Sequence, residues 1–258
     1  MAVSLPAPLI GIVGGVGPYA GLDLAAKVFG QTRAQSDQEH LPLALLSLPH
    51  TIADRTAYLL GETPENPAFA LAEVVRGLEA LGATAIGIPC NTAHAPGIFD
   101  VLLAELARTG SRARVLHMIR ETARLLAETQ PGVRQVGVLS TTGTARAGVY
   151  PAILRPLGVV ALAPADDVQS RVQAAIYDPA YGIKAQSSPV TPRARGELLA
   201  AAEHLRAAGA EAIILGCTEV SLALPERTLH GLPAVDPTLA LARALIRETY
   251  PDRLKPLV

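Results

Sequence analysis

The stretch LEALGATAIGIPCNT at residues 78–92 has a close echo in LRAAGAEAIILGCT at residues 205–218. Each stretch reads as the end of a helix, a Gly-Ala turn, a short apolar strand and then a cysteine followed by polar residues. The two cysteines, Cys90 and Cys217, lie 127 residues apart. This repeat predicts that the same strand-to-loop unit occurs twice in the fold.

A second pair of segments recurs at nearly the same distance. LIGIVGGVG, from Leu9, matches QVGVLSTTG, from Gln135, and places Gly11 126 residues before Gly137. Two matched pairs at one offset indicate a duplicated α/β unit. Because the unit occurs only twice, the pattern argues against a solenoid.

Short apolar runs alternate with longer helical patterns along the whole chain, which is typical of βα units around a parallel sheet. We therefore predict an α/β protein with two similar Rossmann-like or flavodoxin-like halves. Each half is expected to be a parallel sheet flanked by helices, and the halves to be related by a pseudo-two-fold axis. The first domain is expected at residues 1–115 plus 228–258, and the second at 116–227.

Composition and charge exclude several classes of protein. A net charge of -1 offers no electrostatic footprint for nucleic acid. The first charged residue is Asp23, but five glycines and three prolines interrupt the 22 residues before it, so a membrane span is not expected there. No basic signal-peptide region precedes this segment, and two cysteines are too few for a disulfide scaffold, so the cytoplasm is the expected location.

The cysteines suggest a specific chemistry. Each is predicted to follow the carboxyl end of a strand, where open parallel sheets bind ligands. Two thiols on opposite sides of a ligand could invert a stereocentre, because a thiolate removes the proton and a thiol supplies one on the other face. The thiol pKa of about 8.5 is expected to fall beside helix N-termini. Asn91, Thr92 and Thr218 could donate hydrogen bonds to a substrate carboxylate.

Five segments, GIVGGVGP, IADRTAYLLG, IPCNTAH, LSTTGT and ILGCTE, resemble in order those of the cofactor-independent aspartate/glutamate racemase family. The resemblance runs from about Leu9 to Leu224 and implies that Cys90 and Cys217 are the proton donor and acceptor. It also implies that neither pyridoxal phosphate nor a metal takes part. Which cysteine acts on which enantiomer stays open.

The resemblance further implies a set of substrate contacts. Arg55 is expected to hold a substrate carboxylate, and Lys184 to supply a second positive charge. The full set expected to bind substrate is Asp54, Arg55, Thr56, Asn91, Thr92, Ala93, Lys184 and Thr218.

The substrate is expected to be a small amino acid, with aspartate first. Val16, Gly21 and Ala53 depart from the usual family pattern, so glutamate or a broader range of amino acids stays open. The resemblance also leads us to expect a homodimer, and no nucleic-acid or membrane partner.

Other interpretations fit parts of the sequence. Residues 15–20 match a dinucleotide-binding pattern, but the acidic residue that such a site needs, Asp37, precedes the second predicted strand. Cys90 and His94 form a C-x-x-x-H pair with too few partners for zinc, and His94 is expected to make a capping or loop contact. A binding protein without catalysis, or an isomerase or decarboxylase that uses one cysteine, also stays open.

Overall fold

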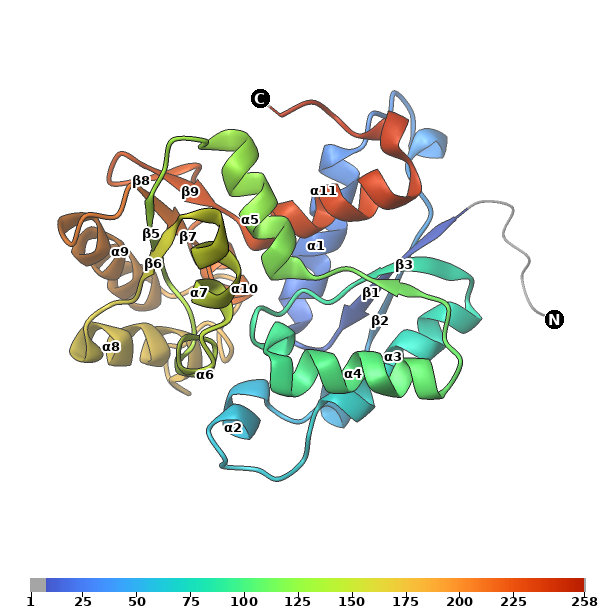
Figure 1. Ribbon diagram of the computed structural model, residues 1–258, viewed down its shortest axis with the longest axis horizontal. Helices are drawn as coiled ribbons and strands as arrows, with labels where there is room; N and C mark the ends of the chain where they lie inside the picture. Colours follow the sequence, from blue (N-terminus) through green and yellow to red (C-terminus); the bar gives the residue numbers. More distant parts are fainter. Residues whose placement is uncertain (1–7, 258) are drawn as a thin grey trace. The chain divides into compact units, whose positions relative to one another are not determined.

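Figure 1 shows a computed structural model of the chain, which describes residues 8–257. The chain divides into two units, each with its own sheet and helices. The first unit ends at Glu121 and resumes at Thr238, and the second comprises Thr122–Pro237. Residues 228–237, expected in the first domain, belong instead to the second, because β9 (Leu232–Val235) pairs with a strand of the second sheet.

The sheet of the first unit has the order β2-β1-β3-β4, and all its strands are parallel. Its strands are β1 (Leu9–Gly14), β2 (Leu43–Ser47), β3 (Ala83–Gly87) and β4 (Arg114–Val115). β1 is buried along its whole length, as expected of a central parallel strand covered by helices on both faces.

Helices cover both faces of the first sheet. On one face, α3 (Ala68–Ala80) and α4 (Pro96–Arg108) form a core with Val13 of β1. On the other face, α1 (Pro18–Gln31) and α11 (Pro237–Thr249) pack on Ile12, the neighbour of Val13. Alternate residues of a strand point to opposite faces, so this division follows from the strand itself.

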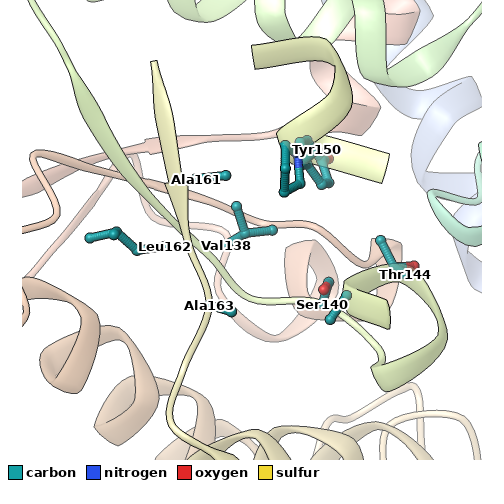
Figure 2. Close-up of a pocket in the computed structure, with 9 residues that line it drawn as sticks. Val138, Ser140, Thr144, Tyr150, Ala161, Leu162 and Ala163 are labelled. Carbon is teal, nitrogen blue, oxygen red and sulfur yellow. The ribbon is translucent and has the colours of Figure 1, made fainter. Parts of the chain in front are cut away.

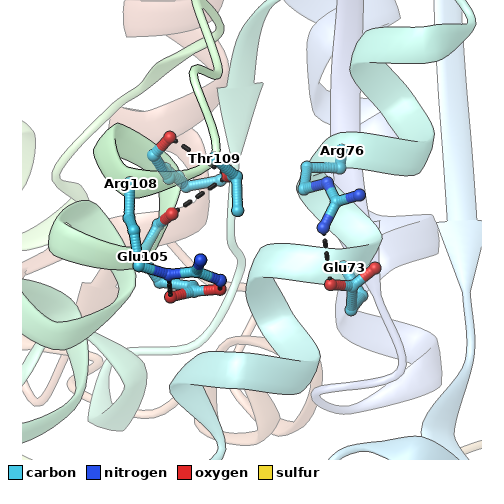
Figure 3. A network of polar contacts seen from close by, with 6 residues as sticks. Glu73, Arg76, Glu105, Arg108 and Thr109 are labelled. Atoms are coloured by element: carbon cyan, nitrogen blue, oxygen red, sulfur yellow. Dashed lines mark hydrogen bonds and ion pairs between the residues drawn. The ribbon is translucent and has the colours of Figure 1, made fainter.

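The outer surfaces of α3 and α4 carry ion pairs within each helix. Figure 3 shows Arg76 donating to Glu73 at 2.8 Å on α3, and Arg108 donating to Glu105 on α4. Both pairs join residues three positions apart, which are neighbours on a helix surface. Exposed pairs of this kind add little stability, so these helices depend on their buried faces.

The sheet of the second unit has the order β6-β5-β7-β9-β8. Its strands are β5 (Gln135–Val138), β6 (Val160–Leu162), β7 (Ala212–Ile214), β8 (Thr228–Leu229) and β9 (Leu232–Val235). The first four in this order are parallel, and β8 is antiparallel to β9. The order of the four parallel strands repeats that of the first sheet, as the sequence repeat predicts.

The remaining helices are mostly short. They are α2 (Arg55–Leu59), α5 (Met118–Thr129), α6 (Thr142–Arg146), α7 (Val149–Leu154), α8 (Asp166–Tyr177), α9 (Pro192–Ala207) and α10 (Thr218–Ala223). The core of the second unit lies where α8, α9 and α10 pack against its sheet. Within residues 8–257, no helix combines the length and apolar character that crossing a membrane requires.

The repeat extends to the packing of single atoms. A Cβ on Gly11 would lie 3.4 Å from the Cβ of Leu78, and a Cβ on Gly137 would lie 2.8 Å from that of Leu205. In both units, therefore, a strand glycine allows the preceding helix of the repeat to approach the sheet. These pairs occupy corresponding places in the two matched segments, which confirms that the two sheets are built on one plan.

The turn that leads into each cysteine strand is also shared. Gly82 and Gly209 have φ angles of 98° and 95°. A residue with a side chain rarely adopts this conformation, so glycine is required at both positions. The turn therefore directs the chain into β3 and into β7 in the same way.

Candidate active site

Cys90 lies just beyond the carboxyl end of β3. Its side chain is buried, with 7% of the residue exposed. Its backbone N–H donates to the carbonyl of Ile88 at 2.8 Å, and its carbonyl accepts from the N–H of Ala93 at 3.2 Å. These bonds lead into a single 3₁₀ turn, Thr92–His94, so the loop after the strand is tightly folded.

Cys217 occupies the corresponding place after β7, immediately before α10. It is 5% exposed, and its carbonyl accepts from the N–H of Val220 at 3.0 Å. Val220 follows Cys217 by three residues, as Ala93 follows Cys90. The strand, the cysteine and the turn behind it are thus repeated in the two units.

The thiol of Cys217 contacts a buried carboxylate that sequence reasoning did not assign to the site. Its Sγ donates to Oε2 of Glu219 at 3.0 Å, and Oγ1 of Thr218 donates to the same oxygen at 3.1 Å. Nζ of Lys184 lies 3.5 Å from the other oxygen, Oε1. Glu219 is only 4% exposed, so its charge is met by protein groups within the fold.

This environment changes the expected acidity of Cys217. Burial raises the pKa of the Cys217 thiol well above its ordinary value, and the negative charge of Glu219 raises it further. Lys184 opposes this effect with the smaller contribution. The expectation that the helix start would lower the pKa is therefore wrong for Cys217, because burial and the adjacent carboxylate outweigh it.

The first unit brings Arg55 to the loop that follows Cys90. Arg55 is the first residue of α2, and α2 packs against the 3₁₀ turn Thr92–His94. The side chain of Asp54 caps α2 by accepting from the N–H of Ala57 at 2.9 Å. Arg55 is 6% exposed, and its Nη1 donates to the carbonyl of Ala53 at 3.2 Å. Asp54, Arg55 and the loop residues after Cys90 thus belong to one corner of the first unit.

The second unit holds Lys184 in an ordered loop after α8. The Lys184 N–H donates to the carbonyl of Ile176 at 3.0 Å, and its Nζ lies 4.9 Å from the ring centre of Tyr177. At Gly182, a Cβ would lie 2.5 Å from the backbone N of Asp178, so the loop closes too tightly for any side chain there. These contacts place Lys184 beside Glu219.

His94 makes the loop contact that the sequence led us to expect. Its Nδ1 donates to the carbonyl of Cys90 at 2.8 Å, and Leu116 O lies 3.4 Å from Nε2. Its ring stacks on Phe99 with centroids 4.8 Å apart. Burial lowers the pKa of His94 to about 3, and His117 lowers it as well. A neutral His94 therefore fixes the backbone of Cys90.

A small cavity lies next to Tyr150 in the second unit. Its volume is about 40 Å³, and its lining includes Val138, Ser140 and Thr144 (Figure 2). Such a volume suits a few water molecules and is too small for an amino acid. Burial raises the pKa of Tyr150 well above its ordinary value, a hydrogen bond with Thr122 opposes this shift, and the negative charge of Asp236 adds to it.

Each unit therefore assembles part of the predicted set. The first contains Cys90 with Asp54, Arg55, Thr56, Asn91, Thr92 and Ala93, and the second contains Cys217 with Thr218 and Lys184. Sequence reasoning quoted Glu219 within a motif but gave it no role. A signal was present, because an acidic residue two positions after Cys217 lies in the first turn of a short helix that is otherwise apolar or hydroxylated.

Comparisons with known proteins agree with the two-sheet α/β fold. Residues 13–245 match the Asp/Glu/Hydantoin racemase family. The solved Picrophilus torridus aspartate racemase is 29% identical, with a TM-score of 0.78 over 93% of this chain and 94% of that one. An aspartate racemase homologue from Pyrococcus horikoshii is 22% identical, with a TM-score of 0.69 over 93% of this chain and 97% of that one, and supports the fold.

A glutamate racemase from Pseudomonas putida is 32% identical over 174 residues, which are 64% of this chain. The matched region spans 58% of that relative's length. The family match covers most of the chain and both cysteine loops. The chain therefore belongs to the Asp/Glu/Hydantoin racemase family.

Proposed function

We propose that the protein is an amino-acid racemase that interconverts L- and D-aspartate by proton transfer at Cα. The observation that carries this proposal is the repeated placement of Cys90 and Cys217. Each follows a central strand of its own sheet, and each carbonyl is tied to the residue three positions later. Inversion of a stereocentre requires one proton-transferring group for each face, and in this proposal each unit supplies one thiol.

In the proposed reaction, one cysteine acts as a thiolate and the other as a thiol. The thiolate takes the proton from Cα as the Cα–H bond breaks. The thiol then gives its proton to the opposite face of Cα, which inverts the centre. The protein's own thiols supply both proton transfers, and neither pyridoxal phosphate nor a metal is needed.

Arg55 is proposed to bind a carboxylate of the substrate. A guanidinium can hold a carboxylate through two parallel hydrogen bonds, and Arg55 is buried beside the loop of Cys90. Asp54 keeps Arg55 at the start of α2 through its cap. Neutralising a carboxylate lowers the energy of the carbanion that forms when Cα loses its proton.

The other proposed contacts come from the cysteine loops. Asn91, Thr92 and Ala93 directly follow Cys90, and Thr218 directly follows Cys217, so we propose that their side chains and N–H groups contact the substrate. Thr56, the residue after Arg55, is proposed as a further contact to the substrate. Lys184, which faces Glu219 in the second unit, is proposed as a further contact to a carboxylate of the substrate.

Aspartate is the favoured substrate because the Picrophilus torridus aspartate racemase matches over nearly the whole chain. Glutamate is the second candidate, since the Pseudomonas putida relative is a glutamate racemase. We further propose a cytoplasmic homodimer that acts on a free amino acid and has no nucleic-acid or membrane partner. Light scattering of the purified protein tests the dimer.

The proposed function is tested by incubating the purified, reduced protein with L-aspartate in D₂O. We expect the Cα–H signal to disappear from the NMR spectrum while D-aspartate appears on a chiral column. Exchange and inversion of glutamate alone would correct the substrate and keep the reaction. The absence of both exchange and inversion with aspartate, glutamate and other amino acids would contradict the proposal.

A further inference from the structure

We propose that Glu219 holds the thiol of Cys217 in its protonated form through the Sγ–H···Oε2 hydrogen bond, so that Cys217 is the cysteine that rests as the acid. This inference rests on the proposed racemase function. It concerns which thiol carries the proton before substrate binds, and it leaves open which enantiomer each cysteine acts on.

Three contacts converge on the carboxylate of Glu219. Oε2 accepts from Sγ of Cys217 at 3.0 Å and from Oγ1 of Thr218 at 3.1 Å, and Oε1 faces Nζ of Lys184 at 3.5 Å. A carboxylate that accepts two hydrogen bonds and faces an ammonium group is held in its ionised form. An ionised carboxylate can only accept, so the hydrogen between it and Cys217 belongs to the sulfur.

Loss of that hydrogen would place two negative charges side by side. The thiolate of Cys217 would lie 3.0 Å from a carboxylate oxygen inside the protein, and the hydrogen bond between them would be gone. Like charges at this distance disfavour ionisation of one member of the pair. The thiol is therefore the stable form of Cys217.

The other titratable groups near Cys217 do not reverse this preference. Tyr150, on α7, is fully buried and neutral, and Asp236, after β9, adds negative charge while it accepts from Ser221 at 3.0 Å. Lys184 is the cation that acts on Cys217, and it also faces Glu219. The raised pKa of the Cys217 thiol agrees with this arrangement.

The arrangement gives the reaction a defined starting state. For the enantiomer that Cys90 deprotonates, a Cys90 thiolate takes the proton as the Cα–H bond breaks, and the S–H bond of Cys217 breaks as its proton moves to the other face. The product state has Cys90 as the thiol and Cys217 as a thiolate beside Glu219, and the resting state returns when Cys90 releases a proton to water and Cys217 takes one from water. Glu219 is thus a positioning residue, since it acts on the substrate through Cys217.

The test uses the reactivity of Cys217 alone. In a Cys90→Ser background, the rate of alkylation by iodoacetamide and the thiolate absorbance near 240 nm are measured against pH. Adding Glu219→Gln removes the charge and keeps the size of the side chain. We expect the midpoint of thiolate formation to fall by about one unit or more, which is at least a tenfold gain in thiolate at a fixed lower pH.

Two variants serve as controls. Glu219→Asp keeps the charge, so its midpoint should lie closer to that of the parent than the Gln variant does. Glu226→Gln removes a carboxylate that Arg195 pairs with on the surface, and should leave the midpoint unchanged. An unchanged or higher midpoint in Glu219→Gln would overturn the proposal, whatever happens to the melting temperature.

The outcome is independent of the racemase assay, because it needs no substrate. A fall in the midpoint together with no racemisation would support the role of Glu219 and reject the proposed function. Racemisation together with an unchanged midpoint would support the proposed function and reject the role of Glu219. In the enzyme that retains Cys90, Glu219→Gln should shift the midpoint of the pH profile of kcat and should change KM little.

Discussion

Acid should destabilise the protein through His94, which is 1% exposed and neutral in the folded state. Its Nδ1–H is bonded to the carbonyl of Cys90, and its ring is enclosed by Phe99 and His117. Burial, with the repulsion of His117, lowers the pKa of His94 to about 3. In the unfolded chain the same imidazole has its ordinary pKa of 6.5.

These two pKa values fix the sign and the size of the effect. Between about pH 6.5 and pH 3 the imidazole of His94 binds a proton in the unfolded chain but not in the folded protein. The free energy of unfolding therefore falls as the pH falls. At pH 5 the unfolded imidazole is nearly all protonated and the folded one is nearly all neutral. The loss between pH 8 and pH 5 is about 2 kcal/mol for His94 alone.

Urea unfolding at pH 8 and pH 5 measures this loss. The wild type is compared with His94→Gln, which keeps an amide N–H for the Cys90 carbonyl but does not titrate. The variant is expected to be less stable at pH 8, because it loses the stacking on Phe99. Its further loss between pH 8 and pH 5 should be smaller than that of the wild type by about 2 kcal/mol.

Exposed His50 provides the matched control. His50→Gln should leave the acid sensitivity of the wild type unchanged, because this side chain lies at the surface, away from the packed ring of His94. Equal acid sensitivity in wild type and His94→Gln would refute the reasoning. A His94 imidazole signal that titrates near its ordinary pKa in NMR spectra of the folded protein would refute it as well.

Two further predictions follow from the packing and from the proposed site. Gly137→Ala should lower the free energy of unfolding by about 1–3 kcal/mol in urea, because the new Cβ would lie 2.8 Å from Leu205. Gly132→Ala, in open space, should change it by less than about 0.5 kcal/mol, and an equal effect of the two would contradict the packing argument. Arg55→Lys should lower kcat/KM for aspartate by about 10- to 100-fold, since a lysine cannot hold a carboxylate through two parallel bonds. Arg76→Lys on the surface of α3 should have no such effect, and full activity of the Arg55 variant would remove Arg55 from the proposed site.

Much of the fold could be predicted from the repeat. The turn glycines, the strand glycines and the cysteines recur at one offset, and this was enough to predict two similar sheets. The alternation of short apolar runs with longer helical patterns likewise agrees with the long helices that flank both sheets, such as α11. Burial on both faces of β1 makes its apolar run clear, so the central strands were the easiest to find.

The edge strands and short helices could not be predicted in the same way. β8 and β9 hold only a few residues, with Pro233 in β9 and Gly231 between them, and neither shows an apolar alternation. β9 pairs with β7, and β8 pairs with β9, so these strands are defined by their place in the sheet and not by a local pattern. The domain boundary was therefore placed too early in the sequence, before β8.

The sequence predicts which residues form the candidate site better than it predicts the charges and the burial around them. The sequence places Glu219 two positions after Cys217, but only the fold shows that the carboxylate turns back to the thiol and meets Lys184. In the same way, the burial of His94 comes from Phe99 and His117 packing around it. Charges and burial depend on distant segments, so single motifs do not reveal them.

The measurement that tests the two-thiol mechanism most directly compares Cys90→Ser and Cys217→Ser with the wild type. Each protein is incubated with L-aspartate and, separately, with D-aspartate in D₂O, and both Cα–H exchange and inversion are followed. The mechanism predicts that either substitution abolishes inversion, while one remaining thiol can at most exchange the proton on its own face. Inversion at the wild-type rate in either variant would contradict the account, because a single cysteine would then be sufficient.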